Sequence, residues 1–139
     1  MIYNERKADL FTIDHTYHLA HCISSDFALG AGIALTFQQR MGKLLEDHKI
    51  HGECPDAILT GRVFNLVTKE NAWGKPTMQS LEGALNMMKD LALEKGIHRI
   101  AMPRIGCGLD RLKWEDVSAT IRSVFADTDI EILVCYLKE

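Results

Sequence analysis

The chain has 139 residues, of which 47% are hydrophobic and 25% charged, with a formal net charge of −3 at pH 7. This length predicts one domain, residues 1–139, with a full hydrophobic core, and this composition excludes a disordered chain or a coiled coil. The negative charge excludes a broad nucleic-acid-binding surface, although a local basic patch of Arg99, Arg104, Arg111 and Lys113 could contact a polyanion. A monomer is the default expectation.

The sequence predicts no membrane span and no secretion signal. No apolar run approaches the roughly 20 residues that a spanning helix needs, and the polar segment Met1–Lys7 lacks the core of a signal peptide. The four cysteines form no Cys-x-x-Cys pair, which disfavours a zinc site. We therefore expect reduced thiols in a cytoplasmic protein.

In the first half of the chain, the pattern of apolar residues predicts strands at Ile2–Asn4 and Tyr17–Ile23. Helical spacing follows from Gly32 to about His48. Two further strands, Ala57–Thr60 and Val63–Thr68, are joined by the short connection Gly61-Arg62, which indicates a hairpin.

In the second half, a helix is predicted at Pro76–Lys95, with Pro76 in its first turn and Gly96 as its C-terminal stop. A strand at Ile97–Met102, a helix at Trp114–Phe125 and a strand at Ile130–Leu137 follow. Alternating strands and helices predict an α/β fold, and the hairpin indicates that its central sheet is mixed.

Two glycine-containing loops each follow a predicted strand and lead into a predicted helix. The first is Ser24–Gly32, and the second is Met102–Leu112. Helix N-termini favour anions, and glycine lets the backbone approach a ligand closely. Ligands of open α/β sheets bind outside the carboxyl ends of strands, so the two loops together could hold a diphosphate. The alternative is that these glycines only turn the chain.

A third loop contains Lys75, which lies between Gly74 and Pro76 just before the helix predicted after it. The helix N-terminus disfavours a nearby ammonium, so a lysine there could lose its proton and act as a nucleophile. Position alone favours the alternative, a solvated surface lysine.

Two residues of the second loop also allow two interpretations. Asp110 is either a catalytic carboxylate or a helix-start residue without chemistry. Cys107 is either a thiol activated near a helix N-terminus or, as we favour, a small packing residue. The six histidines show no metal-ligand spacing, and among them we single out His21 as a candidate pocket residue.

These residues resemble a macrodomain, specifically the subgroup of the terminal ADP-ribose protein glycohydrolase. The resemblance covers nearly the whole chain, and its most specific part is the string from Met102 to Leu112. The other matching segments are Ala8-Asp9-Leu10-Phe11, His21-Cys22-Ile23-Ser24, Gly30-Ala31-Gly32-Ile33-Ala34, Lys75-Pro76-Thr77, Trp114-Glu115 and Thr128-Asp129-Ile130. It implies a three-layer α/β/α sandwich that binds ADP-ribose across the crest of a mixed sheet.

The resemblance also implies roles for individual residues. Asp9 would accept a hydrogen bond from the adenine amino group. Ser24 and Gly30–Ile33 would hold one side of the diphosphate and distal ribose, and Ile105–Leu109 the other. The complete implied binding set is Asp9, Leu10, His21, Ser24, Gly30, Ala31, Gly32, Ile33, Pro103, Ile105, Gly106, Cys107, Gly108 and Leu109.

The subgroup hydrolyses ADP-ribose esters of glutamate side chains and O-acetyl-ADP-ribose. Its catalytic lysine and aspartate map onto Lys75 and Asp110, and the resemblance implies no metal and no cofactor. Two other functions stay open: a module that binds ADP-ribose on proteins without chemistry, and a hydrolase that removes ADP-ribose from nucleic acid.

Two positions depart from the subgroup's pattern. Ala8 replaces the glycine that usually precedes the adenine-binding aspartate, and Cys135 replaces the aromatic residue that stacks on adenine. Tyr136 is adjacent, but the alternation of side chains along a strand predicts that it points to the opposite face. The manner in which this chain holds a base is therefore an open question at this point.

Overall fold

The computed structural model describes residues 1–25, 32–41, 53–70, 74–107 and 112–137. Within these residues the chain forms a six-stranded sheet of order β1-β6-β5-β2-β4-β3, in which every neighbouring pair is parallel except β3 and β4. The strands are β1 (Ile2–Lys7), β2 (His18–Ser24), β3 (Asp56–Thr60), β4 (Val63–Lys69), β5 (Arg99–Met102) and β6 (Glu131–Tyr136). The sheet is mixed, as the sequence predicts.

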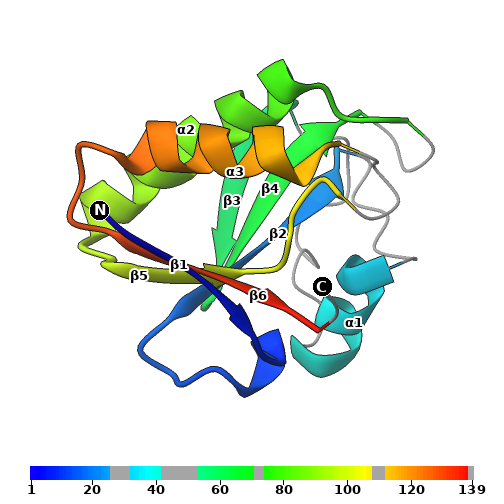
Figure 1. Cartoon of the computed structure of the whole chain (residues 1–139). Helices are drawn as coiled ribbons and strands as arrows, with labels where there is room; N and C mark the ends of the chain where they lie inside the picture. The colour runs from blue at the N-terminus through cyan, green and yellow to red at the C-terminus, as the bar shows by residue number, and fades with distance from the viewer. Residues whose placement is uncertain (26–31, 42–52, 71–73, 108–111, 138–139) are drawn as a thin grey trace.

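Helices cover both faces of this sheet (Figure 1). The helices α2 (Met78–Lys95) and α3 (Trp114–Phe125) pack against each other on one face, and α1 (Gly32–Met41) contacts β2 on the other. The short 3₁₀ helix η1 (Leu10–Thr12) lies on the same side as α1. This arrangement confirms the predicted three-layer α/β/α sandwich.

Side chains of the interior strand β6 alternate between the two faces of the sheet. Ile132 and Val134 join the core under α2 and α3, whereas Leu133 and Cys135 join the core that contains Leu10 and Phe37. Residues 132–135 are buried because β6 lies between β1 and β5 and is covered on both faces. The predicted continuous apolar strand is therefore confirmed.

The largest helix, α2, begins two residues later than its sequence pattern predicts. Thr77 caps it, since its side chain accepts from the backbone N–H of Ser80 while the Ser80 hydroxyl accepts from the backbone N–H of Thr77. Pro76 is therefore a buried residue before the cap, and its predicted place in the first turn is wrong. The predicted stop is confirmed, because Gly96 adopts φ 67° as the C-cap.

The remaining predicted elements agree with the structure within a few residues. The hairpin of β3 and β4 turns at Gly61, which has φ 57°. In α1, Phe37 is fully buried as expected, but Ile33 is 37% exposed because it lines a cavity instead of the core. The predicted continuation of this helix to His48 lies outside the described residues.

Candidate functional site

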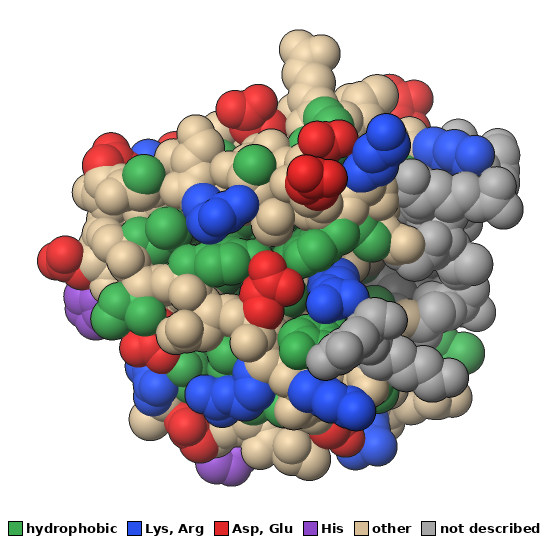
Figure 2. Space-filling model, viewed as in Figure 1, with side chains coloured by type: hydrophobic (Ala, Val, Ile, Leu, Met, Phe, Trp, Pro, Cys, Tyr) green, Lys and Arg blue, Asp and Glu red, His purple; other side chains and the backbone are tan. Residues whose placement is uncertain are grey.

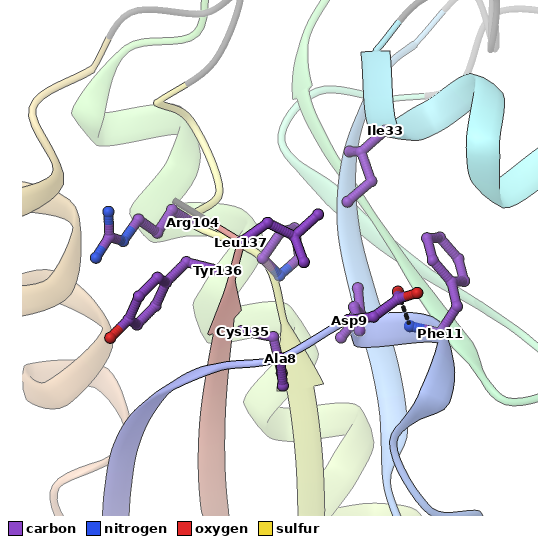
Figure 3. A pocket seen from close by; sticks show the side chains of 10 residues that line it. Ala8, Asp9, Phe11, Ile33, Arg104, Cys135, Tyr136 and Leu137 are labelled. Atoms are coloured by element: carbon purple, nitrogen blue, oxygen red, sulfur yellow. Dashed lines mark hydrogen bonds between the residues drawn. The ribbon is translucent and has the colours of Figure 1, made fainter. Parts of the chain in front are cut away.

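A cavity of about 230 Å³ lies beyond the carboxyl ends of β1 and β6 (Figure 3). The residues that line it are Ala8, Asp9, Leu10, Phe11, Ile33, Pro103, Arg104, Cys135, Tyr136 and Leu137. Four segments far apart in sequence thus meet at one place, and four of the predicted binding residues, Asp9, Leu10, Ile33 and Pro103, line it together.

Asp9 is placed at this cavity by the backbone pairing of β1 with β6. The Ala8 N–H donates to the Tyr136 carbonyl at 3.0 Å, which extends the parallel pairing to the residue before Asp9. Asp9 then caps η1, because its Oδ1 accepts from the Phe11 N–H at 3.0 Å. One carboxylate oxygen is thus bound to the backbone, and Asp9 lies beside the cavity with its carboxylate fixed in orientation.

The walls of the cavity are mainly apolar. Cys135 is 4% exposed and lies at the base of the cavity close to Ala8, whereas Ile33 and Leu137 are 37% and 67% exposed. Large apolar side chains that remain exposed beside a cavity are typical of a ligand-binding surface. Sequence reasoning missed Leu137 as a lining residue, although its position directly after an apolar strand was a usable signal.

Tyr136 points away from Asp9, as the alternation along β6 predicts (Figure 3). Its ring lies under the guanidinium of Arg104, with 4.3 Å between the Arg104 Cζ and the ring centroid. Both residues border the cavity, on the side opposite Asp9. Neither was singled out as a ligand-binding residue from the sequence, because the pairing of Arg104 with Tyr136 depends on tertiary structure.

The loop after β5 is closed by its own backbone. Gly106 has φ +75°, and its carbonyl accepts from the Leu112 N–H at 2.7 Å. A Cβ at Gly106 would meet Leu112 Cδ1 at 3.0 Å. Both the positive φ and this close contact therefore favour glycine here. The Ile105 N–H already donates to the Pro103 carbonyl at 2.8 Å. This bond turns the Ile105 N–H toward its own loop, so of the predicted backbone donors in the described part we keep Gly106 and Cys107 as the candidates.

Three predicted residues of this loop, Gly108, Leu109 and Asp110, lie outside the described residues. So do Gly30 and Ala31 of the first glycine loop. Gly32 is described as the first residue of α1, which confirms the predicted step from loop to helix.

The thiol of Cys107 is half-buried, and this burial raises its pKa, while the nearby Arg104 acts in the opposite direction. A thiol with a raised pKa stays protonated at neutral pH and is a poor nucleophile. This favours the interpretation of Cys107 as a packing residue. We expect Cys107→Ala to retain most of the wild-type turnover, measured as release of ADP-ribose at pH 7. A total loss of turnover in a folded variant would instead support a catalytic thiol.

Ser24 lies at the end of β2, where the pairing with β4 shifts register between Ile23 and Ser24. Its side chain is buried. The next residue anchors the loop start, because the Ser25 N–H donates to the Lys69 carbonyl at 2.8 Å and its hydroxyl donates to the Glu70 carbonyl at 2.7 Å. The first predicted loop thus leaves the sheet from a fixed point at the carboxyl end of β2.

Lys75 is exposed and lies two residues before the Thr77 cap of α2. Pro76, which follows it, is buried and so fixes the backbone at this point. Because β4 is parallel to β2, the two strands have their carboxyl ends at the same edge of the sheet, and Lys75 follows β4 in sequence before α2 begins. The predicted position of Lys75 just ahead of a helix is confirmed.

His21 does not line the cavity at Asp9. It is a fully buried residue of β2, and its ring stacks on the ring of Phe37 in α1 with 4.1 Å between the centroids. Its Nε2 lies 2.6 Å from Oδ1 of Asn65, whose amide nitrogen donates to the Ile58 carbonyl and the Thr60 hydroxyl. Asn65 therefore accepts through Oδ1, so Nε2 carries the proton and the Nδ1 lone pair has no partner.

Burial lowers the pKa of His21 to about 4, against the opposing effect of the Asn65 hydrogen bond. Because the pKa in the folded state lies below the unfolded value, the unfolded chain binds more protons in acid, and stability falls as pH drops from 6.5 toward 4. We expect the wild type to lose about 2 kcal/mol of unfolding free energy between pH 7 and pH 5. Denaturant unfolding at the two pH values measures this loss.

His21→Gln keeps an amide donor for Asn65 but does not titrate, so we expect it to remove most of this pH dependence. The exposed His98 provides the matched control, because His98→Gln should retain the wild-type loss. The carboxylates of Asp14 and Glu131 have lowered pKa values, mainly because Asp14 accepts a hydrogen bond from Thr16 and Glu131 accepts one from Tyr17. Their contribution to the unfolding free energy is therefore lost only at more acidic pH. An equal pH dependence in His21→Gln and wild type would contradict the assignment.

Two residues of the predicted basic patch lie apart. Arg99 begins β5, where it pairs with Glu131 at 3.2 Å, whereas Arg104 follows the opposite end of that strand and faces Glu5 at 3.9 Å. Arg111 lies outside the described residues. Arg99 is therefore not part of one basic surface with Arg104. Basic and acidic side chains are interspersed on the face shown in Figure 2.

No helix in the described part of the chain is long and apolar enough to cross a membrane. No group of three or more His, Cys, Asp or Glu side chains among the same residues could hold a metal ion. The four cysteines, all of them among the described residues, form no disulfide.

The sequence and fold together define the class of this protein. The model of the Macro domain family matches residues 20–121. This chain belongs to the macrodomain family.

Two curated relatives are similar over most of the chain. The ADP-ribose glycohydrolase OARD1 of Homo sapiens is 48% identical over 132 residues, which cover 92% of this chain and 87% of that protein. The Bos taurus protein of the same name is 47% identical over 132 residues, which again cover 92% of this chain and 87% of that protein.

Solved structures support the fold. The macrodomain of Mycobacterium tuberculosis DarG has a TM-score of 0.81 at 21% identity, covering 96% of this chain and 97% of that chain. Thermosipho africanus DarTG in complex with ADP-ribose has a TM-score of 0.74 at 16% identity, covering 92% of this chain and 39% of that chain.

Proposed function

We propose that this protein is an ADP-ribosyl hydrolase that cleaves the ester between ADP-ribose and a glutamate side chain, and also O-acetyl-ADP-ribose. The observation that carries the proposal is 48% identity, over 92% of the chain, to a protein named ADP-ribose glycohydrolase. The apolar cavity beside Asp9 and the exposed Lys75 near the carboxyl end of β4 agree with it.

In the proposed complex, the adenine base enters the cavity and its amino group donates to Asp9. The base packs against aliphatic side chains, because Cys135 stands where an aromatic ring would stack and Tyr136 points away. Ile33 and Leu137, both exposed beside the cavity, provide the apolar contact area.

The diphosphate lies between the two glycine loops. Ser24 and Gly30–Ile33 hold one side, and the backbone N–H groups of Gly106–Leu109 hold the other, near the N-termini of α1 and α3. The loop at Gly106 closes beside the cavity residue Pro103, which supports a binding role in addition to the turn that Gly106 makes.

The chemistry begins at the anomeric carbon of the distal ribose. The unprotonated Lys75 amine attacks this carbon, a C–N bond forms, the C–O bond to the ester breaks, and the carboxylate leaves with its electron pair. Asp110 accepts the proton that the amine loses and returns it to the lysine nitrogen as the C–N bond breaks. As a carboxylate again, it takes a proton from the water that attacks the anomeric carbon and releases this proton to solvent. The products are free ADP-ribose, the carboxylic acid and regenerated Lys75.

The proposal is tested with the wild-type chain and three substrates: a protein ADP-ribosylated on glutamate, O-acetyl-ADP-ribose, and ADP-ribosylated DNA. Release of ADP-ribose from the first two supports the proposed ester hydrolase. Release from DNA alone would replace it with the nucleic-acid hydrolase. Calorimetric binding of ADP-ribose without release from any substrate would replace it with the non-catalytic binding module.

We place these reactions on ADP-ribosylated proteins in the cytoplasm. Four free cysteines, three of them partly exposed, suit a reducing compartment.

A further inference from the structure

Glu5, on the edge strand β1, connects three other parts of the molecule. Its Oε1 accepts from the Trp114 indole N–H at 3.2 Å and faces Nη2 of Arg104 at 3.9 Å. Its Oε2 accepts from the Tyr3 hydroxyl at 2.9 Å. This single carboxylate thus joins β1, the start of α3 and the segment that follows β5.

Arg104 and Trp114 stand on either side of the loop that leaves β5. Arg104 comes two residues after the end of β5, and Trp114 is the first residue of α3. Between them, the loop is closed by the hydrogen bond from the Leu112 N–H to the Gly106 carbonyl. Glu5 therefore contacts both flanks of the segment that contains Ile105, Gly106 and Cys107.

The orientation of Arg104 depends on these contacts. Its guanidinium lies over the Tyr136 ring at 4.3 Å and over the Trp114 ring at 6.0 Å, and its Nε is buried without a hydrogen-bond partner. Two rings and one carboxylate thus contact the Arg104 guanidinium. Removal of Glu5 would take away the carboxylate that faces this guanidinium and accepts from the Trp114 indole.

Stability alone is a weak reason for this arrangement. The Glu5 and Arg104 side chains are 32% and 31% exposed, and ion pairs of such exposure contribute little to folding. A comparable carboxylate, Glu131, pairs with Arg99 and accepts from Tyr17 at the amino end of β6, far from the loop. Glu131 thus offers a matched position with similar partners but no contact with the glycine loop.

We propose that Glu5 is a positioning residue, which holds the segment Ile105–Cys107 in the geometry that binds the diphosphate. This inference rests on the proposed function, since that function places the diphosphate at this segment. Glu5 acts through Arg104 and Trp114 and does not touch the ligand itself.

The binding test uses Glu5→Ala, Glu5→Gln and Glu131→Ala, with ADP-ribose measured by calorimetry and adenosine by NMR titration. Glu5→Ala should weaken ADP-ribose binding about fivefold, the effect of one hydrogen bond, and weaken adenosine binding less, because adenosine carries no diphosphate. Glu5→Gln should stay within about twofold of wild type, because its amide oxygen still accepts from Trp114. Both variants remove the same charge, so their difference reports geometry.

Three binding results would overturn the inference: wild-type ADP-ribose affinity in Glu5→Ala, an equal loss for adenosine, or an equal loss in Glu131→Ala. Absence of ADP-ribose binding by the wild type would instead refute the proposed function.

A second measurement tests the positioning role without any ligand. Hydrogen exchange of the Leu112 amide reports the closing bond to Gly106, because exchange requires that this bond opens. Faster exchange in Glu5→Ala, with wild-type exchange in Glu131→Ala, supports the role of Glu5. Unchanged exchange in Glu5→Ala would refute it, whether or not the protein binds ADP-ribose.

Discussion

Lys75→Ala is expected to abolish release of ADP-ribose from a glutamate-linked substrate, with turnover reduced by about a hundredfold or more. Loss of the amine removes the proposed nucleophile, and no other group is proposed to form the bond to the anomeric carbon. Binding of ADP-ribose should persist, because Lys75 is exposed before the Thr77 cap and does not line the cavity at Asp9. Turnover assays and calorimetry on the same preparation measure the two effects separately.

The matched control is Lys95→Ala, which removes an exposed lysine at the C-terminal end of α2, the helix that follows Lys75. It should leave both turnover and binding at wild-type levels. Lys75→Arg keeps the positive charge but supplies a guanidinium, which is a poor nucleophile, and it should be as inactive as Lys75→Ala. Normal turnover by the Lys75→Ala protein would show that the lysine mechanism is wrong.

Asp110→Ala is expected to abolish turnover, or nearly so, and to accumulate a covalent adduct of ADP-ribose on Lys75. Without the carboxylate, no group of the chain is proposed to activate the water that displaces the lysine. Intact-protein mass spectrometry after incubation with substrate detects the adduct, and peptide mapping assigns it to Lys75.

Asp116→Ala is the control for this substitution, because Asp116 is an exposed carboxylate in the first turn of α3, six residues beyond Asp110. It should turn over substrate normally and accumulate no adduct. If Asp110→Ala also turned over normally, Asp110 would be a helix-start residue without chemistry. An adduct on any residue other than Lys75 would identify a different nucleophile.

Much of the fold could be predicted because local patterns specify it. The helix α2 and its stop at Gly96 depend on residues close together in the chain, and both appear near their predicted positions. The start of α2 was misplaced because a proline suits two positions, the first turn and the residue before a cap. Thr77 decides between them by its reciprocal bonds with Ser80.

The candidate site was predicted unevenly, for a physical reason. Asp9, Pro103 and Ile33 were identified through motifs of the family. The strand order β1-β6-β5 brings Asp9 near Pro103, and α1 adds Ile33 to the same cavity. His21 was expected to line a pocket, yet it is buried against Phe37, since a strand with helices on both faces has no exposed side. A single sequence does not say which buried polar residue meets a partner such as Asn65.

By itself, the sequence determined the alternation of strands and helices, the hairpin, the glycine loops and the opposite directions of Cys135 and Tyr136. Each of these depends on residues close together in the chain, whose periodicity and backbone preferences can be read directly. The tertiary structure alone decided that Glu5 meets Trp114, 109 positions later, and that Arg99 and Arg104 lie at opposite ends of one strand. These contacts follow from the order of the strands in the sheet, in which β1 pairs with β6 through its backbone although the two are distant in sequence.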